Sequence, residues 1–235
     1  MTRYLFVGAL ALVMLGPAVA ADLPQPMQPP PPQAPAAYMP AMAPVYNWGG
    51  IYFGANGGYG FGSSNWLAPG APPTTLTGHF NASGFLVGPT LGINVQADAL
   101  VFSVEGDFDG SWIKGSTDIC IPPVACETQN NWLATARGRL GYAAADRVLI
   151  YGTAGGAFGN ISANTSGTAF QQEIKAGWTA GGGVEAAFSD HWTARIEYLF
   201  VDMQDANLTG VTITPLTVKL ENLSIVRLGI DYKFR

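Results

Sequence analysis

The chain contains 235 residues, of which 48% are hydrophobic and only 11% are charged, and its formal net charge is −5. This balance excludes a nucleic-acid-binding protein, because the sequence holds no cluster of Lys and Arg to neutralise phosphates. Together with a positive mean hydropathy, the low share of charged residues makes the chain unusually apolar for a soluble domain.

Residues 1–20 have the features of a secretory signal peptide. Arg3 supplies the positive start, residues 5–15 form an apolar run, and Ala18 with Ala20 fits the rule for cleavage after small residues. No other segment approaches the roughly 18–20 uninterrupted apolar residues of a transmembrane helix. We therefore expect an exported chain without a helical anchor, and such a signal equally suits a soluble periplasmic protein.

Residues 21–46 are predicted to form a proline-rich periplasmic extension. The segment includes the run from Pro29 to Pro32. Proline lacks a backbone donor and favours the extended polyproline II conformation. A semi-rigid spacer is the favoured interpretation, and a ligand for a proline-binding module is the alternative.

Beyond the extension, the dominant pattern is the alternation of apolar with polar or glycine residues that is typical of β-strands. Near the C-terminus Val226, Leu228 and Ile230 form an apolar row, and Arg227 and Asp231 lie on the opposite face. No helix-length amphipathic segment remains to cover such faces, so lipid is the simplest cover. Strands are predicted at about 49–61, 84–96, 101–112, 132–143, 148–158, 174–188, 192–203 and 220–234.

The connections alternate in length. Tight turns are predicted at 96–100, 144–147 and 189–191. The long connections, rich in Gly, Ser, Thr, Asn and Pro, cover 62–80, 113–130, 159–173 and 204–219. Short periplasmic turns and long outside loops are typical of outer-membrane barrels. For residues 47–235 we therefore predict an all-β fold, an eight-stranded antiparallel transmembrane up-and-down β-barrel in the bacterial outer membrane, in contact with lipid and lipopolysaccharide.

The non-apolar faces of the predicted strands carry charges of both signs. They are Glu105, Asp107, Arg137, Arg139, Glu185, Arg195, Glu197, Arg227 and Asp231. An eight-stranded barrel is just wide enough for its own side chains to fill, and buried charges are tolerated only when they are paired. We interpret these residues as a structural network inside the barrel, with the acids of the third strand near the arginines of the fourth. A selective ion path, as in a narrow porin for small solutes, is the alternative.

Cys120 and Cys126 lie in one short polar segment of an exported chain. We predict a disulfide between them, which contributes about 2 kcal/mol by closing a small loop. A metal site is disfavoured, because no His is near them in the sequence and the CxxC spacing is absent.

Ser189, Asp190 and His191 are the residue types of a hydrolase triad, but consecutive residues in a tight turn do not generally point at one reacting centre. Glycine clusters at 155–156 and 181–183 precede no helix, so they lack the helix N-terminus of a phosphate loop. We therefore expect no enzymatic activity, no catalytic residue, no cofactor and no metal. A lipid or peptide hydrolase is the alternative, since some outer-membrane barrels are such enzymes.

Aromatic residues gather near the predicted strand ends, mostly on the outward face. They are Trp48, Trp112, Trp132, Trp178, Trp192, Tyr198, Tyr232 and Phe234. Rings in such positions suit the headgroup boundary on each side of a bilayer, and a sugar-binding platform is the alternative.

Five motifs in order carry a resemblance to a known family. They are residues 47–52 (NWGGIY), 104–108 (VEGDF), 177–185 (GWTAGGGVE), 192–198 (WTARIEY) and 227–234 (RLGIDYKF). Over about residues 46–234 the chain resembles the small outer-membrane β-barrel proteins of alphaproteobacteria, of the major 25–31 kDa surface-protein type.

The resemblance implies an OmpA-type barrel of the porin family, with roles in envelope integrity and as a surface antigen. It also implies that Tyr232 and Phe234 form the signal read by the barrel assembly machinery, although Arg235 follows Phe234 where the family usually ends on the aromatic. Haemin is implied as a ligand of some members, and a host surface is the ligand expected if the loops act as an adhesin. His79 is then the candidate haemin residue, against an exposed loop histidine without function.

We therefore expect an outer-membrane barrel with a structural, envelope-integrity role that presents its loops to the outside. A narrow porin, and an adhesin or haemin-binding protein acting through its loops, are the alternatives. Bilayer conductance separates the porin from the structural barrel.

Overall fold

The computed structural model describes residues 46–68, 74–75, 79–121, 124–165, 171–208 and 216–234. The predicted signal peptide and nearly all of the predicted extension lie outside the described residues. The regular elements of the described part are all β-strands: β1 (Gly50–Ala68), β2 (Thr74–Thr75), β3 (Phe80–Ala97), β4 (Leu100–Ile121), β5 (Val124–Ala145), β6 (Val148–Thr165), β7 (Gln171–Ala187), β8 (Trp192–Met203), β9 (Ala206–Leu208) and β10 (Leu216–Phe234). In these residues there is no helix with the length and apolarity needed to cross a membrane.

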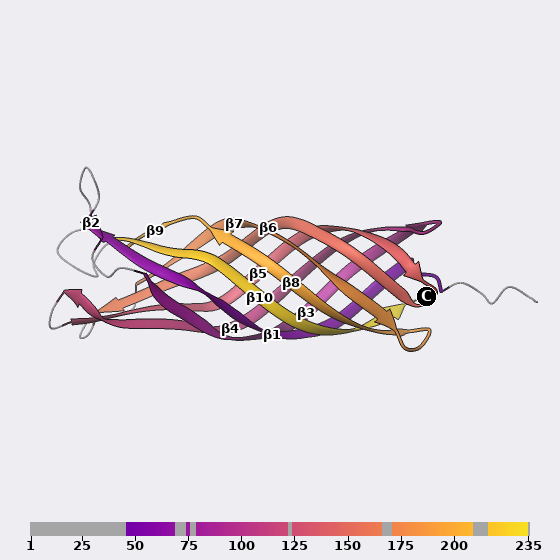
Figure 1. Ribbon diagram of the computed structural model, residues 1–235, viewed down its shortest axis with the longest axis horizontal. Helices are drawn as coiled ribbons and strands as arrows, with labels where there is room; N and C mark the ends of the chain where they lie inside the picture. The colour runs from indigo at the N-terminus through magenta and orange to yellow at the C-terminus, as the bar shows by residue number, and fades with distance from the viewer. Residues whose placement is uncertain are drawn as a thin grey trace, which may run out of the picture. The chain divides into compact units, whose positions relative to one another are not determined.

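Eight long strands close into one antiparallel barrel (Figure 1). β1, β3, β4, β5, β6, β7, β8 and β10 follow one another around the sheet, and β10 pairs with β1 to complete the circle. The short strands β2 and β9 pair with the ends of β1 and β10. Neighbours in the sequence are thus neighbours in the sheet, and the predicted up-and-down barrel is confirmed. We call the β1–β10 junction, where Ile51 lies opposite Phe234, the seam.

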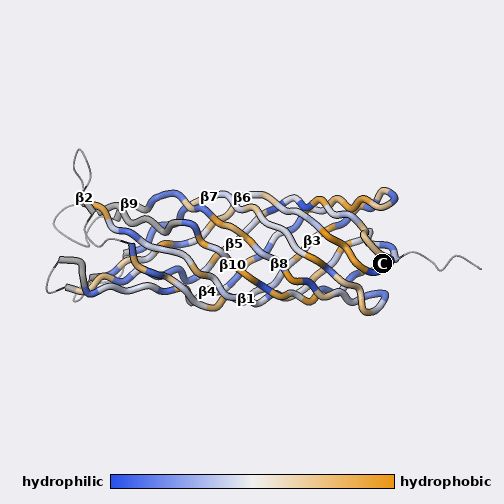
Figure 2. Tube along the Cα trace, in the orientation of Figure 1, coloured by the Kyte–Doolittle hydropathy of each residue, from blue (hydrophilic) through white to orange (hydrophobic). Residues whose placement is uncertain are grey.

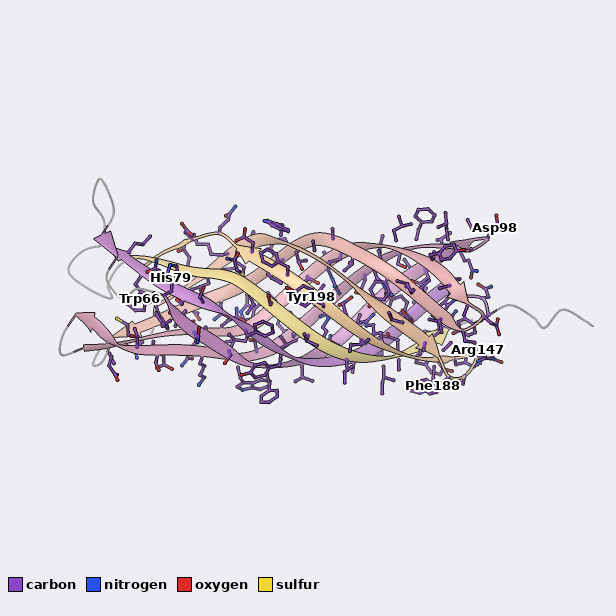
Figure 3. All side chains as sticks on the ribbon, viewed as in Figure 1. Trp66, His79, Asp98, Arg147, Phe188 and Tyr198 are labelled. Carbon is purple, nitrogen blue, oxygen red and sulfur yellow. The ribbon has the colours of Figure 1, made fainter. Side chains whose placement is uncertain are left out.

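The two ends of the barrel differ. The β3–β4, β5–β6 and β7–β8 connections are short turns, as predicted, and they lie together at what we call the turn end. Figure 3 shows Asp98, Arg147 and Phe188 at the turn end, and Trp66 and His79 toward the opposite end, the loop end. The first described residues and the C-terminus also lie at the turn end (Figure 1). In barrels of this type the short turns face the periplasm.

Apolar side chains face outward along the middle of the strands, and polar side chains face the lumen. Phe85 is 69% exposed and Val104 is 67% exposed, whereas Glu105 is 1% exposed. Figure 2 shows hydrophobic and hydrophilic residues alternating along the strands, with hydrophobic stretches most prominent toward the turn end. An apolar surface of this extent is typical of contact with lipid.

The strands reach further toward the loop end than predicted. β4 continues to Ile121 and β5 begins at Val124, so the predicted long loop at 113–130 is wrong. Strand residues also shorten the predicted loops at 62–80, 159–173 and 204–219. The apolar alternation ends where a strand leaves the hydrocarbon, because polar residues then suit both faces, whereas the backbone ladder continues. β8 matches its predicted bounds, 192–203.

The lumen is filled in three layers. A loop-end cluster consists of Trp66, Ala82, Leu86, Ile113, Cys126, Leu133, Ala157, Ile161, Ala163, Leu199, Val201, Met203, Leu223 and Ile225. A turn-end cluster consists of Tyr46, Trp48, Val101, Leu149, Tyr151 and Ala187. The charged residues lie between them. The predicted outward position of Trp48 is wrong: this residue precedes β1, is fully buried and packs among the turn-end cluster.

Candidate functional site

The charged residues predicted for the interior come from five strands and meet in the lumen. They are Glu105 and Asp107 of β4, Arg137 and Arg139 of β5, Glu185 of β7, Arg195 and Glu197 of β8, and Arg227 and Asp231 of β10. Asp109 of β4 joins them through an ion pair with Arg227. All carry odd numbers, and on these strands the odd residues face inward because side chains alternate. The side chains in these ion pairs are at most 5% exposed.

Glu105 is one centre of the network, because three guanidinium groups bind its carboxylate. Its Oε1 accepts a hydrogen bond from Arg137 Nη2. Its Oε2 accepts from Arg139 Nη1 at 3.1 Å and from Arg195 Nη1 at 2.6 Å. The hydroxyl of Tyr52 on β1 donates to the same Oε2 at 2.6 Å. Four different side chains thus donate to this one carboxylate.

Arg227 is the second centre. Its Nε donates to Glu197 Oε1 at 2.7 Å, and its Nη2 donates to Asp107 Oδ2 at 3.1 Å. Its Nη1 lies 3.2 Å from Asp109 Oδ2. Arg137 also binds Asp107 at 2.8 Å and Glu197 at 3.0 Å. Because Arg137 also binds the first centre, the two centres form one network.

Some of these ion pairs follow the strand ladder and others cross the lumen. Glu105 lies opposite Arg137 on the neighbouring strand, which is the arrangement expected for sequential strands. By contrast, Arg195 on β8 and Arg227 on β10 reach acids of β4, a strand that neighbours neither of them in the sheet. The side chains therefore bridge the lumen rather than only lining its wall.

Neutral side chains complete the network, and sequence reasoning missed them. The hydroxyl partners are Tyr52, Thr90, Thr135, Tyr151 and Thr193. Tyr151 donates to Glu197 Oε2 at 3.1 Å, and its ring centroid lies 3.8 Å from the guanidinium carbon of Arg139, a cation–π contact. The sequence did hold a signal for Tyr151. Alternate residues of a strand share one face, and Thr153 and Ala157, at even spacing from Tyr151, also face inward.

Glycines on β1 leave the room that the charged side chains of β10 occupy. A Cβ added at Gly54 would lie 2.0 Å from Asp231 Oδ1 and 2.4 Å from the carbonyl oxygen of Ile230. A Cβ at Gly58 would lie 2.6 Å from the Cβ of Arg227. Real Cβ atoms do not approach other atoms this closely, so glycine is required here for strand β10 to lie against β1.

Asp231 is the least bonded acid of the network. Its Oδ2 lies 3.4 Å from Arg195 Nη1. Within the part of the chain that the structure describes, neither of its carboxylate oxygens accepts a hydrogen bond. Among these same residues, no group of three or more His, Cys, Asp and Glu has a geometry that could hold a metal ion.

The residue types of the hydrolase triad have separate partners in the β7–β8 turn. The hydroxyl oxygen of Ser189 accepts from the backbone amides of His191 at 3.3 Å and Trp192 at 3.0 Å. Asp190 forms an exposed ion pair with Arg147 at 3.1 Å. The ring of His191 stacks on Tyr232, with centroids 5.6 Å apart. The three side chains are thus not brought together as a triad.

Two other predicted sites lie at the loop end. Cys126 is buried and disulfide-bonded, whereas the side chain of Cys120 lies outside the described residues, so the pairing stays a prediction. His79 precedes β3 and is exposed near the loop end (Figure 3). The predicted haemin role of His79 likewise stays a prediction.

Aromatic residues mark the two boundaries of the outward apolar face. Trp112 and Trp178 are exposed toward the loop end. At the turn end, Tyr232 packs against Trp192 and Phe234, with ring centroids 5.1 Å apart in each pair. Tyr198 differs from the prediction, because it lies near the middle of the barrel rather than at a boundary (Figure 3). The role of Tyr232 and Phe234 in assembly stays a prediction.

Comparison with known proteins finds clear relatives. Residues 34–234 match the family model described as outer membrane protein beta-barrel domain. The chain is 35% identical over 212 residues to the 31 kDa outer-membrane immunogenic protein of Brucella melitensis, covering 83% of this chain and 88% of the relative. It is 34% identical over 230 residues to the 25 kDa outer-membrane immunogenic protein of Brucella canis, covering 97% and 96%.

A more distant relative and a solved structure agree with this picture. The 22 kDa outer membrane protein of Rhizobium leguminosarum is 30% identical over 193 residues, covering 81% of this chain and 80% of the relative. The crystal structure of the outer membrane protein OprG from Pseudomonas aeruginosa matches with a TM-score of 0.50 and 12% identity, covering 80% of this chain and 97% of that chain. At this identity the second likeness concerns the fold alone.

Proposed function

Because the chain belongs to the family of outer membrane protein beta-barrel domains, we propose that it acts as a closed structural barrel that supports the envelope and presents its loop end to the outside. The filled lumen is the observation that carries this proposal. Charged side chains that are at most 5% exposed bind one another across the barrel. These charged groups therefore bind other side chains of the protein and do not form a path along which a solute could bind.

The layering of the lumen supports a barrel that does not conduct. An ion path needs a polar lining that is open to water. Here the polar layer lies between two apolar clusters, with Trp66 buried in one and Trp48 in the other. An ion that entered from either end would first have to displace well-packed apolar side chains, which is costly.

The other parts of the proposal rest on the relatives and on the sequence. The names of the Brucella relatives, outer-membrane immunogenic proteins, support a surface-exposed loop end. Residues 1–20 act as a cleaved export signal and residues 21–46 as a periplasmic extension. Tyr232 and Phe234 serve the barrel assembly machinery. The protein is not an enzyme and works without a cofactor.

Planar-bilayer recording tests the closed lumen. The purified, folded protein is added to a bilayer, and we expect no large, stable single-channel currents, because the network and both clusters block the lumen. A wide porin added under the same conditions serves as the positive control for insertion. Large and stable current steps that scale with the amount of folded protein would contradict the proposal and favour the narrow porin.

A further inference from the structure

Three residues that precede β1, Tyr46, Asn47 and Trp48, form a segment that we call the closing strap. Trp48 is completely buried and Tyr46 is 4% exposed, although neither belongs to a strand. Their rings pack edge to face with centroids 4.8 Å apart. Both rings belong to the turn-end cluster, to which β4, β6 and β7 also contribute. The strap is therefore an integral part of the closed turn end.

The closing strap is hydrogen-bonded to several sides of the turn end. The amide of Trp48 donates to Gln96 Oε1 at 2.6 Å, near the end of β3. The amide of Tyr46 donates to Asp146 Oδ1 at 2.9 Å in the β5–β6 turn. The hydroxyl of Tyr46 donates to the carbonyl oxygen of Asp190 at 3.4 Å in the β7–β8 turn. These partners lie around the circumference of the barrel.

The last strand, β10, holds the closing strap through Lys233. This side chain is buried, and its Nζ donates to the carbonyl oxygen of Asn47. The Nζ also lies 4.5 Å from the ring centroid of Tyr46 and 5.9 Å from that of Trp48. An ammonium group is attracted to aromatic faces, most strongly when it is desolvated. Lys233 lies opposite Tyr52 of β1, so the strap is bound directly at the seam.

We propose that the closing strap is a latch, which docks only after β1 and β10 have paired and then holds the seam closed. Its docking surface combines β3, two turns and β10, and these meet at one end only in the complete barrel. Opening the seam at the turn end separates Lys233 from Asn47, so the strap raises the barrier to opening. The proposal concerns the rate of unfolding, and it holds whether or not the barrel conducts.

Trp48→Ala tests the latch. The full chain is refolded into phosphatidylcholine vesicles and transferred to urea, and the folded fraction is followed with time by its heat-modifiable migration in gel electrophoresis. Trp48→Ala is expected to unfold about tenfold faster or more, because the docked strap loses a buried indole while the opened transition state does not. An unchanged rate overturns the proposal.

Two further variants keep this test sharp. Trp48→Phe is the matched control, because the indole nitrogen has no hydrogen-bond partner in the described part of the chain, so a smaller ring loses little. It is expected to stay within about threefold of the parent rate. Lys233→Met keeps the apolar stem but removes the ammonium, and it is also expected to accelerate unfolding. Lys233→Met therefore tests the latch even if Trp48→Ala does not fold. An unchanged unfolding rate for Lys233→Met overturns the proposal.

A crosslink across the seam separates a latch from simple core filling. Ile51 and Phe234 are cross-strand partners at the turn end, so Ile51→Cys with Phe234→Cys can join β1 to β10. In the oxidised form, Trp48→Ala is expected to change the unfolding rate by no more than about twofold, and in the reduced form its full effect returns. Equal acceleration in both forms overturns the latch. Because Cys126 is disulfide-bonded, the parent chain with and without reductant is the control.

Discussion

Glu105→Gln is expected to lower the free energy of unfolding by about 3–5 kcal/mol, the usual cost of removing one partner from a buried ion pair. The amide is nearly isosteric with the carboxylate, so the change removes charge and leaves the shape. Three guanidinium groups, from Arg137, Arg139 and Arg195, then lose their shared anion. In a lumen closed by apolar clusters, water does not replace it.

Equilibrium urea unfolding of the barrel in lipid vesicles, followed by tryptophan fluorescence, measures this loss. Asp231→Asn is the matched control, since it is the same acid-to-amide change in the same buried layer. Neither Asp231 oxygen accepts a hydrogen bond within the described residues. Its ion-pair partner Arg195, at 3.4 Å, keeps Glu105 at 2.6 Å, so no cation is left without an anion. The replacement is therefore expected to cost no more than about 1 kcal/mol. An equal loss of unfolding free energy in the two variants would show that the three arginines around Glu105 do not make its charge more important for stability than that of Asp231.

Gly54→Ala is expected to prevent normal closure of the seam, at a cost of about 3 kcal/mol or more. The added methyl group would lie 2.0 Å from Asp231 Oδ1 and 2.4 Å from the carbonyl oxygen of Ile230. A side chain can rotate away, but the backbone oxygen belongs to the β1–β10 ladder, in which Gly54 lies opposite Asp231. The two strands would therefore have to separate.

Heat-modifiable migration after refolding into vesicles gives the folded fraction of this variant. Gly57→Ala on the same strand is the control, because its added Cβ would meet other atoms only at 3.8 Å, an ordinary contact distance. The control is expected to fold like the parent chain. If Gly54→Ala folded as well as the parent chain, the added methyl group would fit without separating β1 from β10. That result would contradict the prediction.

Strand alternation in the sequence was sufficient to predict the fold and the direction of its charged side chains. In the last strand, the outward row at Val226, Leu228 and Ile230 implied that Arg227 and Asp231 face inward, and all five are so placed. The alternation predicts side-chain direction because it follows directly from strand geometry.

The partners across the lumen were beyond this reasoning. Arg195 reaches Glu105 over 90 positions of the sequence, and Arg227 reaches Asp107 over 120. Which inward residues meet depends on the tilt and stagger of the strands around the barrel. Alternation within one strand contains no information on either quantity. Pairs on adjacent strands could be expected from the sequence, such as Glu105–Arg137 on β4 and β5. Glu197 and Arg227, which lie opposite one another on β8 and β10, are a second such pair.

The loop-end cluster was missed for a different reason. On β8, Leu199 and Val201 face inward while Tyr198 and Phe200 lie on the other face, so both faces are apolar there. Without contrast between the faces, the pattern does not distinguish a lumen filled by apolar side chains from one that is charged throughout. The buried position of Trp48 was missed because it precedes β1, where strand periodicity does not apply.

The extension of β4 and β5 past the aromatic residue Trp112 gives the loop end a two-stranded surface of its own. The paired strands continue past Trp112 to Ile121, which at about 3.3 Å per residue and a tilt of about 40° is a rise of about 20 Å above the aromatic boundary. In this extension the two strands remain paired, with Lys114 of β4 opposite Gln129 of β5. These two strands form a discontinuous surface. We expect an antibody that recognises it to bind the folded barrel and to lose binding on denaturation, unlike an antibody against a linear peptide.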